Sequence, residues 1–173
     1  MSYCNLGQCS YSRLYVPSTL VPNSKLLLIG ENPSWKELQA MAPFQGPAGA
    51  VLNRVLTKAG IDRSEISLTN LCMCCDTTRE KKNPTAEEID HCLPRLLEEI
   101  ALVDVPVLVL LGALPMAQFY TGLSAISKVR GKPRIWNGRI AVATFHPARA
   151  IATRNPEVEQ IIYEDILLAR SLT

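Results

Sequence analysis

The stretch Lys25–Ser34, KLLLIGENPS, decides the fold of this chain. Its four consecutive apolar residues, Leu26 to Ile29, are typical of a strand buried on both faces, and such strands belong to parallel sheets. The polar turn Gly30–Ser34 follows at once. In an open parallel sheet, ligands bind in the crevice outside the carboxyl ends of the strands. The sequence therefore predicts an α/β fold with this turn at a binding crevice.

A second stretch repeats the pattern far along the chain. The apolar run Ile140–Thr144 leads directly into Phe145, His146 and Pro147. Because the carboxyl ends of parallel strands share one edge of the sheet, two polar turns that are distant in sequence can line one pocket. We therefore expect both turns to contribute to one active site.

Period-2 or continuous apolar runs followed by helical periodicity recur four times, which indicates strand–helix units around a parallel sheet. Strands are predicted at residues 25–29, 66–70, 106–111 and 140–144, and helices at 48–59, 85–102, 114–120 and 156–171. Loops are predicted at 17–24, 77–84 and 122–137. Pro94 should bend the second helix without ending it. The expected fold class is an α/β three-layer sandwich, with a central four-stranded parallel sheet and helices on both faces.

Size, charge and cysteine content restrict the class of protein. A chain of 173 residues that is 47% hydrophobic fits one domain, residues 1–173. The net charge of +2 provides no overall basic excess, so contacts to phosphates must come from local clusters. No segment reaches the roughly 18 apolar residues that cross a bilayer, and Met1–Cys4 does not begin a secretory signal. We expect a cytoplasmic monomer without membrane contact, whose six cysteines bind metal or are buried.

Seven segments, taken in order, resemble one enzyme family. They are VPNSKLLLIGENP, APFQGPAGAVLNRVL, LTNLCMC, NPTAEEIDHCLPRLLEEI, LLGALP, ISKVRGK and ATFHPARA. Their order and spacing resemble the iron-sulfur (family 4) uracil-DNA glycosylases, from Cys4 to about Asp165. The resemblance implies a DNA base-excision repair enzyme that hydrolyses the N-glycosidic bond of deoxyuridine, releases uracil and leaves an abasic site. The nucleotide must first be flipped out, because its target atom is inaccessible inside the stack.

The resemblance assigns three residues to the base pocket. Phe44 matches the aromatic residue that stacks on the flipped base, although a plain core phenylalanine is an alternative. Asn70 matches the residue that reads the uracil edge, and an amide offers both a donor and an acceptor for this. His146 matches the histidine that stabilises negative charge developing on a uracil oxygen. Loss of such a donor typically costs about 3 kcal/mol of transition-state stabilisation.

The turn after the first strand departs from the family pattern. The family generally has Gly-Glu-Ala-Pro-Gly, whereas this chain has Gly30-Glu31-Asn32-Pro33-Ser34. Asn32 resembles instead the Gly-Ile-Asn-Pro-Gly motif of the mismatch-directed branch, in which the amide positions the attacking water. Our hypothesis is that Asn32 orients this water, with Glu31 or Glu37 assisting. Ser34 replaces a glycine, and glycine permits backbone conformations that serine resists.

Four cysteines match the family's cluster ligands. A [4Fe-4S] cluster is held by four thiolates, and by position these are Cys4, Cys9, Cys74 and Cys92. The first pair is spaced Cys-x4-Cys where Cys-x2-Cys is usual. Cys75 is an alternative to Cys74, Cys72 is expected to be buried, and Cys92 could pack as a small hydrophobe on its helix. The cluster would pin the N-terminal segment and a long loop to the sheet, because the hydrolysis transfers no electrons.

The contacts to DNA are expected on the same rim. Arg130 and Lys132 lie in one basic connection, and Arg149 follows the His146 motif, so phosphate-neutralising charge is local. In the superfamily an apolar wedge after this motif fills the gap left by the extruded base. Ile151 is our candidate for the wedge, with Arg149 as the alternative.

Two other functions stay open at this stage. One is a glycosylase of the same fold that removes hypoxanthine or mismatched thymine, which Asn32 makes plausible. The other is a non-catalytic member that binds DNA, although Glu31, Asn70 and His146 are all present. A nucleotide-binding α/β protein is disfavoured, because the first strand leads into Gly30-Glu31-Asn32-Pro33 rather than a Gly-x-Gly-x-x-Gly turn.

Overall fold

The structure is a computed structural model that describes residues 14–75, 83–122 and 125–173. Cys4 and Cys9, two of the expected cluster ligands, lie outside the described residues. The strands are β1 (Leu26–Gly30), β2 (Ser67–Asn70), β3 (Val107–Leu111), β4 (Arg134–Trp136) and β5 (Arg139–Thr144). The helices are α1 (Trp35–Ala40), α2 (Pro47–Lys58), α3 (Ala86–Val103), α4 (Ala113–Phe119), α5 (Ile126–Val129), α6 (Ala148–Thr153) and α7 (Pro156–Ser171), with a 3-10 turn, η2, at Arg63–Glu65.

The strands form one sheet in the order β2-β1-β3-β5-β4. The pairs β1–β2, β1–β3 and β3–β5 are parallel, which confirms the four predicted parallel strands. The short strand β4 pairs antiparallel with β5 at one edge and falls where a loop was predicted. With only three residues, β4 is too short for an alternating pattern to stand out.

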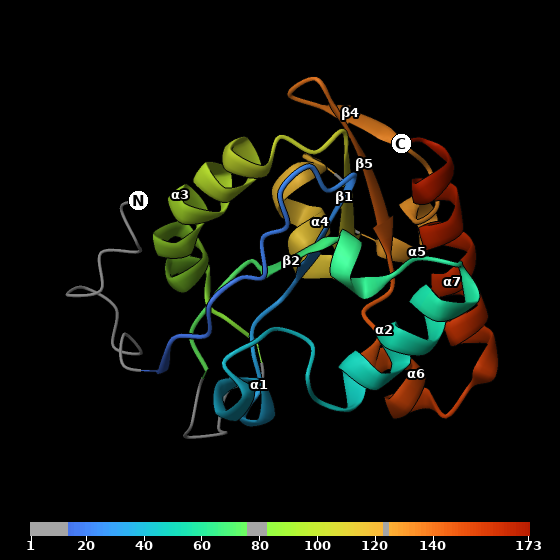
Figure 1. Ribbon diagram of the computed structural model, residues 1–173, viewed down its shortest axis with the longest axis horizontal. Coiled ribbons are helices and arrows are strands. Elements are labelled where there is room, and N and C mark those ends of the chain that lie inside the picture. Colours follow the sequence, from blue (N-terminus) through green and yellow to red (C-terminus); the bar gives the residue numbers. More distant parts are fainter. Residues whose placement is uncertain (1–13, 76–82, 123–124) are drawn as a thin grey trace.

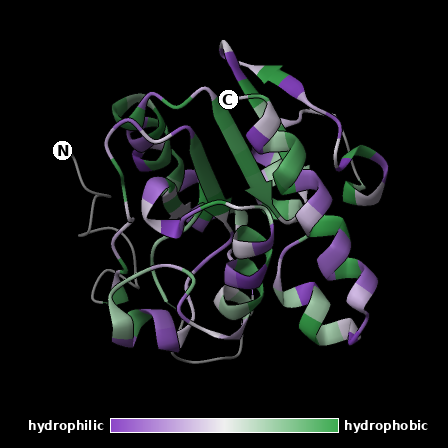
Figure 2. Ribbon diagram, turned by 45° about the vertical axis from the view of Figure 1, so that its right-hand side comes forward, coloured by the Kyte–Doolittle hydropathy of each residue, from purple (hydrophilic) through white to green (hydrophobic). Residues whose placement is uncertain are grey.

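Helices cover both faces of the sheet, as predicted (Figure 1). Successive strand residues point to opposite faces, so each strand contributes to two cores. Leu26 and Leu28 pack with α2 and α7, whereas Leu27 and Ile29 pack with α3 and α4. Figure 2 shows the apolar strands enclosed by helices whose outer faces are more hydrophilic. The continuous apolar run in β1 is therefore explained by burial on both sides.

The four long helices agree with the predicted ranges to within one or two residues. Thr85 caps α3, accepting a hydrogen bond from the Glu88 N–H at 3.2 Å, and the helix continues through Pro94 to Val103. Three short helices, α1, α5 and α6, were not predicted, because four to six residues make too little periodicity. Among the described residues, no helix is long and apolar enough to cross a membrane.

Candidate active site

The site lies at the carboxyl ends of the parallel strands, where their turns are hydrogen-bonded to one another. Gly30 at the end of β1 pairs with Asn70 at the end of β2. The turn after β1 continues alongside the one after β2, since the Cys72 N–H donates to the Glu31 carbonyl at 2.9 Å. On the other side, the Gly112 N–H after β3 donates to the Thr144 carbonyl of β5 at 3.0 Å. These bonds join the turns in two pairs, and the pairing of β1 with β3 places the two pairs side by side.

Gly30 brings Asn70 and Phe44 together. A side-chain Cβ at Gly30 would lie 2.6 Å from Cζ of the Phe44 ring and would collide with Oδ1 of Asn70. Both side chains therefore pack directly on the backbone of Gly30. A glycine is required here by this close approach.

Gly112 has the same role for Glu31 and His146. A Cβ at this position would collide with the Glu31 carboxylate and lie 3.3 Å from Cβ of His146. Its φ of 112° is also a conformation that favours glycine. The rings of His146 and Phe44 have centroids 6.3 Å apart. The structure thus brings Glu31, Phe44, Asn70 and His146 together around the ends of β1 and β3.

Phe44 is held in a strained backbone conformation. Its φ is +55°, an unusual value for a bulky residue, and such strain persists only where surrounding contacts enforce it. The Phe44 N–H donates to Oε1 of Glu37 at 2.5 Å, and Arg63 binds the Pro43 carbonyl at 2.7 Å. Gly49 of α2 packs on the Phe44 carbonyl, with no room for a Cβ. The ring is 3% exposed and also joins the core beneath, so it forms a wall between core and site.

Glu37 supports this loop rather than pointing its carboxylate into solvent. Its Oε2 accepts hydrogen bonds from the N–H and the hydroxyl of Ser34, at 2.8 and 2.6 Å, while Oε1 binds Phe44. Ser34 has φ −91° and ψ 170°, an extended conformation that serine adopts freely. The replacement of glycine by Ser34 therefore causes no backbone strain and adds one donor to Glu37, the Ser34 hydroxyl.

Asn70 carries a buried amide with an unused donor. The residue is 2% exposed, and its Nδ2 has no hydrogen-bond partner within residues 14–75, 83–122 and 125–173. Buried polar groups are nearly always hydrogen-bonded, so an unpaired one needs an explanation. A ligand that accepts a hydrogen bond beside Gly30 would provide one.

His146 is neutral in this environment. Burial lowers the pKa of its imidazole from 6.5 to about 4, because desolvation disfavours the charged form. The backbone N–H of Ala148 donates to Nδ1 at 3.1 Å, which makes Nδ1 an acceptor. The ring proton is then on Nε2. His146 can therefore donate one hydrogen bond from Nε2 at neutral pH.

Glu31 lies in a similarly desolvated position. Burial raises the pKa of its carboxyl group, while a hydrogen bond from the Leu114 N–H opposes the shift by favouring the ionised form. Asn32 follows directly and is half-buried, so its amide lies on the same turn as this carboxylate. A carboxylate and an amide side by side can bind and polarise a water molecule.

Three of the described cysteines follow β2, and Cys92 lies on α3 in contact with Cys72. Cys72 and Cys92 are both buried, and a hydrogen bond between their thiols, with burial, raises the pKa of Cys72. Cys74 is half-exposed and forms a β-bridge with Tyr15, and the Cys75 N–H donates to the Leu14 carbonyl at 3.0 Å. Within the described residues, no three metal-ligating side chains form a group. Two of the four expected ligands, Cys4 and Cys9, precede Leu14, which is the first described residue. Leu14 and Tyr15 pair with the segment that contains Cys74.

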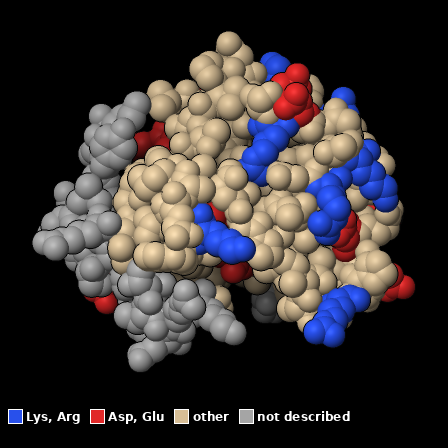
Figure 3. Space-filling model, turned by 60° about the horizontal axis from the view of Figure 1, so that its bottom comes forward, with Lys and Arg blue, Asp and Glu red and all other residues tan. Residues whose placement is uncertain are grey.

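The residues expected to contact DNA lie in different surroundings. Arg130 forms a bidentate ion pair with the buried Asp165 of α7, with N–O distances of 2.8 and 2.5 Å. Lys132 is exposed. Arg149 lies over the Phe145 ring at 4.7 Å, and Ile151 is 44% exposed, both on α6 beside the site. Figure 3 shows this end of the molecule, where basic side chains are spaced over the surface and cover more of it than acidic ones.

Sequence reasoning missed three residues that shape the site. Gly112 was part of a quoted motif, but only the tertiary contact shows that it separates Glu31 from His146. Arg63, in η2, donates a hydrogen bond to the carbonyl of Phe44, which lies 19 residues earlier in the chain. Arg95 is buried on α3 behind Asn70 and was not singled out. An arginine among the apolar residues of an amphipathic face was the available signal for Arg95.

The comparisons with known proteins agree with this geometry. The chain belongs to the uracil DNA glycosylase superfamily, whose family profile matches residues 17–167. Within it, the chain is 34% identical over 151 residues to the type-4 uracil-DNA glycosylase of Thermotoga maritima, covering 86% of this chain and 78% of that protein. It is 30% identical over 166 residues to the type-4 uracil-DNA glycosylase of Sulfurisphaera tokodaii, covering 91% and 74%. The resemblance predicted from the sequence is thereby confirmed.

A relative of another kind also matches. The DNA polymerase of Bacillus phage SP01 is 28% identical over 150 residues, which are 86% of this chain but only 16% of that protein. The matching region is thus a small part of a much longer chain.

Proposed function

We propose that this chain, as a single domain over residues 1–173, is a monofunctional uracil-DNA glycosylase that acts on flipped-out deoxyuridine in DNA. In the proposed reaction, water adds its oxygen to C1′ of the deoxyribose, and the bond from C1′ to N1 of uracil breaks. Uracil departs as an anion that then takes up a proton, and the DNA retains an abasic site. The unpaired Nδ2 of Asn70, beside Phe44 and His146, is the observation that carries this proposal.

Phe44 and Asn70 would bind the base. The Phe44 ring offers a flat wall, and its strained loop is held by Glu37 and Arg63, so the wall is preorganised. The Asn70 amide would use Nδ2 to donate to a carbonyl of uracil and Oδ1 to accept from the ring N–H. Cytosine presents the opposite arrangement of donor and acceptor at this edge, which would leave a buried amide mispaired.

His146 would stabilise the leaving group. The Nε2–H of the neutral imidazole would donate to a uracil oxygen as negative charge develops there. A donor aimed at charge that appears late in the reaction lowers the barrier rather than tightening substrate binding. Burial, which keeps this imidazole neutral, also strengthens the hydrogen bond by lowering the local dielectric.

Asn32 and Glu31 would position the water on the sugar side. The Asn32 amide is the proposed orienting group, with the Glu31 carboxylate accepting a proton from the water. The Leu114 N–H supports the ionised form of Glu31 against burial. Glu37 is less suited to this role, because Ser34 and Phe44 already occupy its two oxygens, so we propose that it positions the base-stacking loop.

The cysteines fit a [4Fe-4S] cluster held by Cys4, Cys9, Cys74 and Cys92. Cys74 and Cys92 lie at the end of β2 and on α3, and the backbone at Leu14 is bonded beside Cys74. Cys9 lies five positions before Leu14, a reach of at most about 17 Å. The cluster, when bound, would supply a cross-link between the N-terminal segment, the turn after β2 and α3, without taking part in hydrolysis.

On the DNA side, Arg149 and Lys132 would contact phosphates, and Ile151 would enter the duplex as the wedge. Ile151 is exposed on α6, and it lines a hollow of about 260 Å³ with Arg54 and Arg154. Arg130 is better explained by its ion pair with Asp165, which fixes the connection before β4 to α7.

The test is release of free base from a uracil-containing oligonucleotide. Wild type should release uracil, and Asn70→Ala and His146→Ala should each lose about 100-fold or more in kcat/KM. Lys25→Gln, an exposed change at the amino end of β1, is the control and should retain activity. Parallel duplexes with hypoxanthine or with thymine opposite guanine test the second candidate that Asn32 suggests. Release of those bases but not of uracil would replace this proposal.

A further inference from the structure

Arg95 is a buried charge that the proposed chemistry does not use. It lies on α3, faces the sheet and is only 4% exposed. Arginine is almost never fully buried unless it is paired, because removing its charge from water is costly. Its partners therefore indicate what it does.

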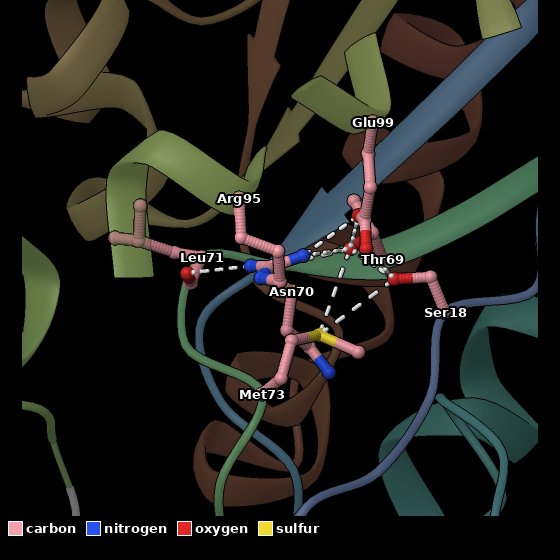
Figure 4. Close-up of polar contacts among 7 residues, drawn as sticks. All are labelled: Ser18, Thr69, Asn70, Leu71, Met73, Arg95 and Glu99. Atoms are coloured by element: carbon pink, nitrogen blue, oxygen red, sulfur yellow. Dashed lines mark hydrogen bonds and ion pairs between the residues drawn. The ribbon is translucent and has the colours of Figure 1, made fainter. Parts of the chain in front are cut away.

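The guanidinium of Arg95 binds the end of β2 at three consecutive residues (Figure 4). Its Nη2 donates to the carbonyl of Asn70 at 2.7 Å and to that of Leu71 at 2.9 Å. Its Nη1 donates to the Thr69 hydroxyl at 3.2 Å. One rigid, planar group thus holds the two backbone carbonyls that follow the Asn70 Cα and the side chain of Thr69 before it.

Glu99, one turn further along α3, balances this charge. Its Oε2 accepts from Nη1 of Arg95 and from the Thr69 hydroxyl, both at 2.7 Å, and its Oε1 accepts from Ser18 at 2.8 Å. Arg95 is therefore held in place by groups from α3, β2 and the segment before β1. This network contacts the Asn70 backbone, whereas the Asn70 side chain packs on Gly30.

The end of β2 needs such support because β2 is an edge strand. On its inner side it pairs with β1. On its outer side, Thr19 pairs with Leu68, and the Arg95 guanidinium follows at the end of the strand. The Asn70 amide has no bond on Nδ2 among the described residues that would orient it locally. Its position is therefore set by its backbone and by packing on Gly30.

We propose that Arg95 is a positioning residue that sets the Asn70 amide in the base slot through the Asn70 carbonyl. The inference rests on the proposed function. A displacement of about 1 Å at a reacting group can cost about 100-fold in rate. Loss of the hydrogen bonds from Arg95 to the Asn70 and Leu71 carbonyls should therefore lower turnover strongly. DNA affinity should change little, because the phosphate contacts proposed for Arg149 and Lys132 come from other elements.

The variant pair separates positioning from stability. Arg95→Met alone leaves the Glu99 carboxylate without its counter-charge and is expected to destabilise the fold. Arg95→Met with Glu99→Gln removes both charges and should restore much of the lost stability. In that folded double variant, single-turnover kcat should fall about 30-fold or more, with KM for DNA within about threefold. Arg139→Met, which breaks an ion pair with the exposed Asp104 at the amino end of β5, is the matched control and should retain full activity.

A mutant cycle with Asn70→Ala tests whether Arg95 acts through Asn70. If it does, adding the Arg95→Met and Glu99→Gln changes to Asn70→Ala should cost no more than about threefold, because the group being positioned is already gone. Multiplication of the two losses would overturn the inference. Retention of the wild-type rate by the double variant would overturn it as well.

A spectroscopic measurement separates this inference from the proposed reaction. In 15N-labelled protein without DNA, the side-chain NH2 signals of Asn70, identified by their loss in Asn70→Ala, should shift in the double variant. Those of Asn137, in the turn between β4 and β5, should not. An unchanged Asn70 signal would refute the positioning role. If the signal shifts while wild type releases no uracil, the positioning role is supported and the proposed reaction is refuted.

Discussion

Gly30→Ala is the most direct probe of how the site is assembled. The added Cβ would lie 2.6 Å from Cζ of Phe44 and collide with Oδ1 of Asn70. Gly30 is not among the residues with positive φ, so the effect comes from the added atom and not from the backbone. Overpacking of this kind costs about 2 kcal/mol, which lowers Tm by roughly 6 °C in a chain of this size.

The expected loss of activity is larger than this loss of stability. Two proposed base-binding groups must move, and a shift of about 1 Å costs about 100-fold, so kcat/KM for uracil release should fall at least that far. Activity would be measured well below Tm, with folding checked by circular dichroism. Gly46→Ala is the matched control, since its Cβ would meet Ser34 and Lys36 at 3.4 Å or more. A Gly30→Ala enzyme with kcat/KM within threefold of wild type would refute the site as described.

The remaining predictions concern protons, charges and cysteines. Burial raises the pKa of Glu31, and its ionised form is proposed to act, so the rate of uracil release should fall as the pH drops through that raised pKa. Glu31→Gln should remove this acidic limb of the pH–rate profile. A profile that is the same in Glu31→Gln and wild type would contradict the proposed role of Glu31. His146 has a pKa of about 4 in the folded protein and about 6.5 in the unfolded chain, so the unfolded chain binds more protons between these pH values. The free energy of unfolding, measured by urea denaturation, should therefore fall as the pH drops from 6.5 to 4. This fall should be smaller in His146→Ala. Arg130→Met should lower the free energy of unfolding by about 3 kcal/mol, because it leaves the carboxylate of Asp165 buried and unpaired, but it should not change the salt dependence of DNA binding. Arg149→Gln should instead reduce by about one the slope of log affinity for DNA against log salt concentration. A reduced slope for Arg130→Met would show that Arg130 does contact DNA. Cys74→Ser and Cys92→Ser should lose bound iron and visible absorption on anaerobic purification while Cys75→Ser keeps them, and the reverse result for Cys74 and Cys75 would exchange their roles.

The local pattern of the chain determined most of the architecture. Continuous or period-2 apolar runs marked β1, β2, β3 and β5, and helical periodicity marked the four long helices, because burial imposes these repeats on any sequence that folds this way. The elements that were missed are short, such as β4 with three residues and α5 with four. Elements of this length are selected by neighbouring structure, and their own residues carry too little pattern to predict them.

For the site, the sequence by itself determined which residues have the right chemistry. Asn70 ends the period-2 run of β2, His146 follows the apolar run of β5, and parallel strands place such residues at one edge of a sheet. Only the tertiary structure decided what surrounds each one. Burial makes His146 a neutral donor, an ion pair with Asp165 occupies Arg130, and the contacts of Arg95 hold the backbone of Asn70. The reason is physical: pKa shifts, ion pairs and close approaches depend on distances between groups far apart in the chain, and those distances exist only once the sheet has formed.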